Sequence, residues 1–210
     1  MYRVLSPHAL VPAAWLALSL AACGDRERSA AVQDTVPAGP ETGMAADSIP
    51  ADTAGASAPL TDANIVALLD EANQADSAAG ALAVTKATSK EVKDFAKLMM
   101  SEHHALREAG QQLAKKLNVT PAPPAADPVK PLAEGEMKAL ESTPKGPEFD
   151  RVYIEQEVAA HKAVLDLAEN AHGQAQNEQL KALIEQAKPV IQKHLDQAEQ
   201  LQDKLGEATS

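Results

Sequence analysis

After residue 60, apolar residues recur at three- and four-residue intervals, which is the pattern of amphipathic helices. The pattern predicts four long helices over residues 62–87, 89–118, 148–171 and 177–205, and a short helix over residues 132–141. Asp62 is a candidate cap for the first of these helices, and Gly173 is a candidate C-cap for the helix that starts at residue 148. Pro189 is expected to kink the last helix, because proline lacks the backbone N–H that a helix interior needs.

The lengths of the connections predict how these helices pack. Short links join the first long helix to the second and the third to the fourth, so each pair should be antiparallel. The proline-rich connection over residues 119–147 is long enough to cross the length of a bundle and contains the short helix. We therefore expect an all-α, ferritin-like four-helix bundle over residues 61–206, with one long crossover between the second and third long helices.

The first 60 residues show no such periodicity. An apolar run from Ala13 to Leu20 follows a basic start at Arg3, and it is too short to span a bilayer but typical of a signal peptide. The run ends in the segment LAACG at residues 20–24, which resembles the bacterial lipoprotein box, where the cysteine is lipidated and becomes the mature N-terminus. A secretory signal with a chance cysteine, or an amphipathic anchor, is the alternative.

The lipoprotein resemblance implies a signal peptide over residues 1–22 and a lipid anchor at Cys23 that holds the chain to a membrane. It places the protein in the bacterial cell envelope, facing the periplasm, and Gly24 after the cysteine favours the outer membrane. Residues 23–60 are rich in Ala, Pro, Ser, Thr, Gly and Asp, and we expect them to form a disordered tether. A short docking motif within the tether is the alternative.

Composition narrows the function classes. A net charge of −11 argues against nucleic acid as a partner. The chain has one cysteine, so it cannot form an internal disulfide or a Cys-based zinc site. Aromatic residues make up only 2% of the chain, which favours an Ala/Leu bundle over a β-sandwich or a sugar-stacking cleft. Phe95, Phe149 and Tyr153 fall on helix stripes and are expected in the core.

Several ionisable residues are in phase with the apolar stripes, so each long helix brings at least one toward the interior. These residues are Asp76, His103 with Glu102 beside it, Glu157, His161 and His194. Metal sites in bundle cores are built in this way, although a buried histidine can also simply pair with a carboxylate. Axial positions place this set at neighbouring levels, with His161 furthest away. The only Glu-x-x-His spacing, Glu169 to His172, falls at a helix end and is expected to be exposed.

Four short runs together resemble the bacterial ferritin-like family known as domain of unknown function 4142, over roughly residues 60–205. The runs are Asn73–Asp76, Phe95–Met99 with Glu102 and His103, Phe149–Asp150 with Tyr153, Ile154 and His161, and Lys188–Val190 with His194, Leu195 and Ala198. The resemblance implies a helical bundle, usually exported, without an agreed activity. The family's acidic-His pair matches Glu102–His103, and its later histidines match His161 and His194. Asp76 stands where the family often has Glu, and its shorter side chain would weaken a bridging ligand.

These observations support one leading hypothesis and two alternatives. The first is a non-enzymatic, membrane-tethered envelope protein whose bundle binds an unidentified protein partner or contributes to envelope stress tolerance. The second is a periplasmic bundle that binds or buffers a divalent transition metal such as iron, copper or zinc. The third, a dinuclear-metal oxidoreductase, lacks the paired Glu-x-x-His motif that such centres use. The candidate metal ligands are Asp76, Glu102, His103, Glu157, His161 and His194.

Overall fold

The computed structural model describes residues 58–207, so the predicted signal peptide, Cys23 and nearly all of the predicted tether lie outside the described residues. Within residues 58–207 the chain is helical and contains no strand. The helices are α1 (Asp62–Lys86), α2 (Lys90–Leu117), α3 (Val129–Ser142), α4 (Pro147–Gln174) and α5 (Glu178–Glu207). None of these helices is both long and apolar enough to cross a membrane.

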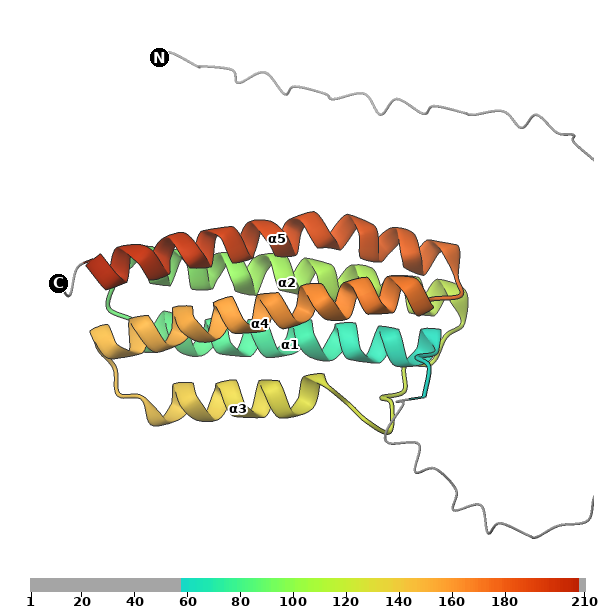
Figure 1. Cartoon of the computed structure of the whole chain (residues 1–210), viewed down its shortest axis with the longest axis horizontal. Coiled ribbons are helices and arrows are strands. Elements are labelled where there is room, and N and C mark those ends of the chain that lie inside the picture. Colours follow the sequence, from blue (N-terminus) through green and yellow to red (C-terminus); the bar gives the residue numbers. More distant parts are fainter. Residues whose placement is uncertain (1–57, 208–210) are drawn as a thin grey trace, which may run out of the picture. The chain divides into compact units, whose positions relative to one another are not determined.

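Helices α1, α2, α4 and α5 form a four-helix bundle in which neighbouring helices run antiparallel (Figure 1). The most extensive contacts join α1 to α2 and α4 to α5, and the two pairs meet where α1 contacts α4 and α2 contacts α5. Helix α3 lies in the long connection and packs on α1 and α4, so the chain returns along the bundle before α4 begins (Figure 1). The predicted all-α bundle with one crossover is confirmed.

The predicted N-cap of α1 and the predicted C-cap of α4 are wrong. Thr61, rather than Asp62, caps α1, because the Thr61 hydroxyl accepts from the Asn64 backbone N–H while the Asn64 side chain accepts from the Thr61 N–H. Gly173 lies inside α4, and Ala175 is the C-cap. Ala175 leaves the helix in an extended conformation, so no left-handed residue is needed there.

Helix α3 begins three residues earlier than predicted. The Asp127 carboxylate accepts hydrogen bonds from the backbone N–H groups of Val129 and Lys130, which provides a start that the apolar pattern does not show. Val129 and Leu140 of α3 are buried, whereas Leu132 is 57% exposed. Helix α5 continues without interruption through Pro189.

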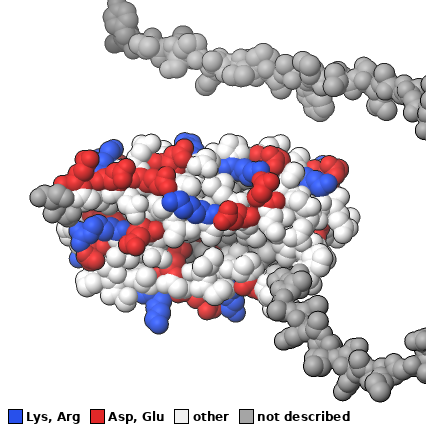
Figure 2. Space-filling model, viewed as in Figure 1, with Lys and Arg blue, Asp and Glu red and all other residues white. Residues whose placement is uncertain are grey.

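Two of the three apolar clusters fill the bundle on either side of a polar layer. One of these two contains Phe95, Phe149 and Tyr153, which confirms the core position of the few large rings. The other contains Ile65 and Ile184, and the third, smaller cluster forms where α3 packs on α1. On the face that Figure 2 shows, acidic and basic side chains are intermingled, and no continuous basic surface is visible.

Candidate metal centre

Three histidines from three helices meet in the polar layer between the apolar clusters. His103 of α2, His161 of α4 and His194 of α5 are each at most 2% exposed. Their ring centroids lie 5.1–5.4 Å apart, and one ring nitrogen of each lies within 4.8 Å of a nitrogen of the other two. The bundle therefore gathers three imidazoles in a space small enough for one ion.

The tautomer of His103 is fixed by Asn73 on α1. The Asn73 amide nitrogen donates to the Leu69 carbonyl oxygen (2.6 Å), so its Oδ1 is turned toward Nδ1 of His103 (2.9 Å). An amide oxygen only accepts, and therefore Nδ1 of His103 carries the proton. The second group near Nδ1, the Asp76 carboxylate at 3.4 Å, is also an acceptor when ionised. In the neutral ring, Nε2 of His103 is left with a free lone pair.

His161 is held in the same way by its own helix. Its Nδ1 lies 2.9 Å from the Glu157 carbonyl oxygen, which can only accept, so Nδ1 donates and Nε2 is unprotonated. This Nε2 faces Nε2 of His103 at 3.4 Å. Two lone pairs thus point at each other with no proton between them. They repel each other unless a cation lies between them.

His194 has a carboxylate on its outer side. Its Nε2 donates to Oε2 of Glu102 at 2.6 Å. This bond is the main reason that the pKa of Glu102 falls below its ordinary value, so the carboxylate is ionised. In the neutral ring of His194 the lone pair is therefore on Nδ1, which is buried and makes no hydrogen bond to any residue between 58 and 207.

The three imidazoles are neutral at physiological pH. Burial lowers the pKa of His103 to about 4. Burial also lowers the pKa of His161 and of His194, in His194 against the opposing hydrogen bond to Glu102. Neutral imidazole is the form that binds metals.

Three buried carboxyl groups lie beside the imidazoles. Asp76 of α1 and Glu157 of α4 each place an oxygen within 4.8 Å of a nitrogen of His161. Glu136 of α3 is 7% exposed and interacts electrostatically with both of them. Both carboxylate oxygens of Glu157, Oε1 of Glu136 and the Tyr153 hydroxyl have no hydrogen-bond partner of normal geometry among the described residues.

These carboxyl groups take up protons more readily than exposed ones. Burial raises the pKa of Asp76 to about 6, against the opposing influence of His161. Burial and the charge of Asp76 raise the pKa of Glu136 to about 8. Burial, followed by the charges of Asp76 and Glu136, raises the pKa of Glu157 well above its ordinary value. A bound cation would displace these protons.

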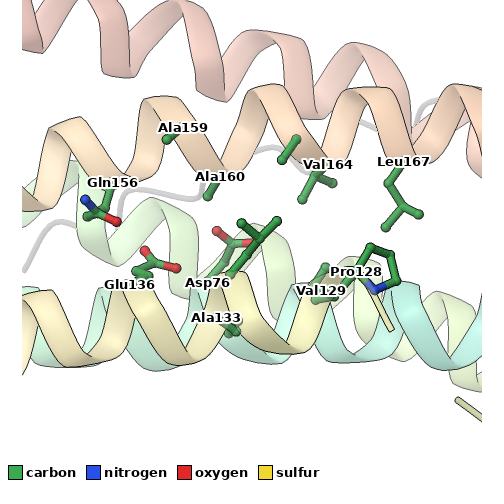
Figure 3. Close-up of a pocket in the computed structure, with 14 residues that line it drawn as sticks. Asp76, Pro128, Val129, Ala133, Glu136, Gln156, Ala159, Ala160, Val164 and Leu167 are labelled. Atoms are coloured by element: carbon green, nitrogen blue, oxygen red, sulfur yellow. The ribbon is translucent and has the colours of Figure 1, made fainter. Parts of the chain in front are cut away.

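Two small cavities approach the layer from different sides. The larger, of about 130 Å³, lies between α1, α3 and α4, and Asp76 and Glu136 line it (Figure 3). The smaller, of about 40 Å³, reaches His103 and Asp76 from a side lined by α1, α2, α4 and α5. An ion therefore has a short path to the layer from the α3 side.

Comparison with known proteins places the chain in a family and gives it a structural relative. The sequence profile described as Domain of unknown function (DUF4142) matches residues 47–201. The chain belongs to the DUF4142 family. A solved structure of CopM in its Cu(II)-bound form has a similar fold, with a TM-score of 0.58 and 17% identity over 70% of this chain and 99% of that chain. No curated protein matches the chain.

This DUF4142 bundle brings five of the six predicted ligands together, and His161 is closer to the others than the axial estimate allowed. The turn between α4 and α5 is centred near residue 176, because α4 ends at Gln174 and α5 begins at Glu178. Counting from that centre, His161 is level with Ile191 and about 4.5 Å along the axis from His194. Glu102 stands apart from the five: it lies outside both clusters of candidate ligand atoms and contacts the outer nitrogen of His194.

The remaining Glu-x-x-His spacing is unrelated to this centre. The Glu169 side chain is 70% exposed and pairs with Lys188, and His172 pairs with Glu185, so the expectation of exposure at the end of α4 is confirmed for Glu169.

Three residues of the site were missed as site residues from the sequence. Glu136 was overlooked because the short helix was read only for its apolar positions, although Glu136 lies four residues before Leu140 and so shares its face. Asn73 lies in one of the runs that resemble the family, but nothing in the sequence indicates that its amide contacts His103. Tyr153 was assigned to the core, where it lies, but its hydroxyl also faces the carboxyl cluster.

Proposed function

We propose that this bundle binds a divalent transition metal through His103, His161 and His194, and that it holds or buffers the metal without catalysing a reaction. The observation that carries the proposal is the pair of unprotonated Nε2 atoms of His103 and His161, 3.4 Å apart. Two nitrogens bound at about 2.0–2.1 Å to one tetrahedral ion lie about 3.3–3.4 Å from each other. The separation in this bundle therefore suits a shared ion.

The outer partners of the three rings support the same proposal. Histidines that bind metals donate their second ring N–H to a carboxylate, a carbonyl or another acceptor, which orients the ring. In this bundle Asn73, the Glu157 carbonyl and Glu102 take these places around His103, His161 and His194 in turn. A bundle that only bound a protein partner would gain nothing from buried lone pairs without partners, because such atoms reduce stability.

Copper(II) is the first metal to test. Imidazole ligands suit copper, zinc, iron and nickel, and copper(II) has the highest affinity among divalent first-row ions for a given nitrogen or oxygen site. CopM, whose fold resembles that of this chain, has been solved in a Cu(II)-bound form. The near-complete burial of the three imidazoles supports retention of an ion rather than reaction with a large substrate.

We also propose that the chain is an envelope lipoprotein that is anchored at Cys23 and faces the periplasm. Gly24 after the cysteine favours the outer membrane as the site of the anchor. The support is the signal-like run and the lipoprotein box in the first 24 residues. In that position the bundle would hold metal ions that enter the periplasm.

The test is metal binding by the full chain in a Cys23→Ser background, which removes the single thiol. After chelator treatment, the protein is titrated with Cu(II) and, separately, with Zn(II), and bound metal is measured by elemental analysis. We expect about one equivalent on the histidines. His103→Ala should weaken binding by more than the roughly 10- to 100-fold that loss of an outer-shell partner costs.

The matched control is His104→Ala. His104 is the next residue on α2, but its side chain is 68% exposed and pairs with Glu108, so its loss should leave binding unchanged. Equal binding by His103→Ala and His104→Ala, or no bound metal in the parent chain, would contradict the proposed function.

A further inference from the structure

Beyond the three imidazoles, the geometry points to a second cation site, formed by the carboxylates of Asp76, Glu136 and Glu157 on the α3 side of the bundle. This site would take a divalent cation that prefers oxygen ligands, and its ligands are distinct from the three nitrogens proposed above. It extends the proposed function, but it does not depend on an ion being held by the histidines.

The first argument is the set of buried oxygen atoms that have no hydrogen bond of normal geometry. Glu157 is 0% exposed, and within residues 58–207 its carboxylate has only the distant Nδ1 of His161, at 3.4 Å, and the Tyr153 hydroxyl beside it. Over the same range, Oε1 of Glu136 also lacks a partner. Buried polar atoms of native proteins are nearly always satisfied, and a bound ion is one of the ways in which they are. Asp76, 4% exposed, is the third member of this group.

The second argument is charge. The side chains that act most strongly on these three carboxyl groups are the carboxyl groups themselves, with His161 and Tyr153. Neither a lysine nor an arginine is among these neighbours in the part of the chain that the structure describes. A buried carboxyl group without a positive partner takes up a proton, because charge is poorly solvated in a protein interior, and it ionises when a metal ion binds. A cation would replace the protons that these groups hold in the metal-free chain.

The third argument is access. Asp76 and Glu136 lie along the cavity of about 130 Å³ between α1, α3 and α4, and Figure 3 shows the two carboxylates between the α3 and α4 ribbons. Alanines, including Ala133, Ala159 and Ala160, make up half of the remaining lining, and most of the other half is larger apolar side chains. A hydrated ion could enter here without disturbing the imidazoles on the other side of Asp76.

The ligand set selects the kind of cation. Carboxylate oxygens suit Mg²⁺, Ca²⁺ and Mn²⁺. Ca²⁺ requires six to eight oxygen ligands, and Mg²⁺ gives up its hydration water reluctantly, so both fit a small buried site less well. Nδ1 of His161 donates to the Glu157 carbonyl oxygen and Nε2 faces His103, so the ligands on the α3 side are the carboxylate oxygens. Mn(II) accepts such oxygens without either restriction and is the probe for this site.

The test measures Mn(II) binding from the loss of the free Mn(II) signal in electron paramagnetic resonance. The full chain carries Cys23→Ser and is compared with the same chain carrying Glu136→Gln, Glu134→Gln or His194→Ala. We expect one Mn(II) per chain, weakened at least about tenfold by Glu136→Gln, as for loss of a partner at a metal site. Glu134→Gln is the matched control, since Glu134 is an exposed residue of the same helix.

The variants separate the two proposals. Mn(II) binding that survives His194→Ala but not Glu136→Gln supports the carboxylate site. Binding lost in His194→Ala but kept in Glu136→Gln would place Mn(II) among the imidazoles, which would overturn this inference and leave the proposed function intact. If the parent chain bound Cu(II) but no Mn(II), this inference would also be overturned and the proposed function would remain intact.

A second measurement needs no variant. When the chain holds one equivalent of Cu(II), Mn(II) bound beside Asp76 should broaden or abolish the Cu(II) resonance, because the two sites adjoin at His161. A Cu(II) resonance unchanged at saturating Mn(II) would overturn the inference, even if Glu136→Gln proved unable to fold.

Discussion

At the scale of single residues, the chemistry of the centre depends on atoms that face away from it. His103, His161 and His194 each donate one ring N–H to an oxygen outside the cluster, and the second nitrogen is thereby left with its lone pair. Each ring is neutral because burial lowers its pKa. The outer acceptors therefore decide which ring nitrogen is available to a metal ion. Removing an acceptor should change the metal affinity even when all three histidines are kept.

Asn73→Ala tests this dependence. Without the amide oxygen, the His103 ring loses the partner that fixes its tautomer and orientation, and we expect metal affinity to fall by about 10- to 100-fold. Isothermal titration with Cu(II) measures the change. Gln74→Ala, at the exposed neighbouring amide, is the control and should bind as the parent chain does. Equal affinities for the two variants would show that Asn73 has no role in the centre.

The buried carboxyl groups predict a pH dependence for the metal-free protein. The pKa of Glu136 is about 8 in the folded chain and near its ordinary value of 4.5 in the unfolded chain. Between these values the folded state holds a proton that the unfolded state has released, so the free energy of unfolding falls as pH rises, by at most about 1.4 kcal/mol per pH unit for each such group. Near pH 6.5 the three buried histidines act in the opposite sense, because they are partly protonated only in the unfolded chain, but above about pH 7.5 they are almost entirely neutral in both states and add little slope.

We therefore expect the chelator-treated protein to lose stability between about pH 7.5 and pH 8.5, with a smaller loss in Glu136→Gln. Urea unfolding followed by circular dichroism at several pH values in this window measures both slopes. A stability that is constant or rises with pH in the parent chain would contradict the raised pKa.

At the scale of elements, the sequence predicted much of the fold because the apolar period of the long helices is regular and their links are short. The stripes also indicated the inward-facing ionisable residues, since position along a helix fixes the face a side chain occupies. The spacing of Glu136 and Leu140 places Glu136 on the buried face of α3, but the sequence could not show which residues that face would meet, because the docking of a short helix depends on its neighbours. It also could not show the tautomers, which depend on Asn73 and Glu102 across helix interfaces.

The close approach of α1 and α2 gives a prediction at this scale. A Cβ atom on Gly80 would lie 2.8 Å from the carbonyl oxygen of Ala96 and 3.0 Å from Cγ of Met100. Gly80→Ala should therefore force the helices apart and lower the free energy of unfolding by about 1–3 kcal/mol. Urea unfolding measures the change.

The control for Gly80→Ala is a second helical glycine. A Cβ on Gly110 of α2 would meet no heavy atom within 4 Å, so Gly110→Ala should leave stability unchanged or raise it by up to about 1 kcal/mol, because alanine favours helix. A loss of stability that is the same in both variants would show that the α1–α2 contact at Gly80 is not the cause.

At the scale of the whole molecule, the proposal joins a metal-binding bundle to a lipid anchor through a linking segment. The anchor rests on Cys23, and the prediction is that Cys23→Ser moves the protein from the membrane fraction to the soluble periplasmic fraction. Cell fractionation with immunoblotting measures the distribution, and Ser19→Ala, within the same signal-like run, should leave it unchanged. A Cys23→Ser chain that stays with membranes would contradict lipid anchoring at this residue.

The most direct test of the central claim is X-ray absorption at the metal edge of the full Cys23→Ser chain loaded with one equivalent of Cu(II) or Zn(II). We predict three imidazole nitrogens at about 2.0–2.1 Å, with the outer-shell scattering typical of histidine rings. The imidazole scattering should decrease in the His103→Ala variant and remain in His104→Ala. A first shell of oxygen ligands without imidazole, or a spectrum that His103→Ala leaves unchanged, would contradict a metal centre built on these three histidines.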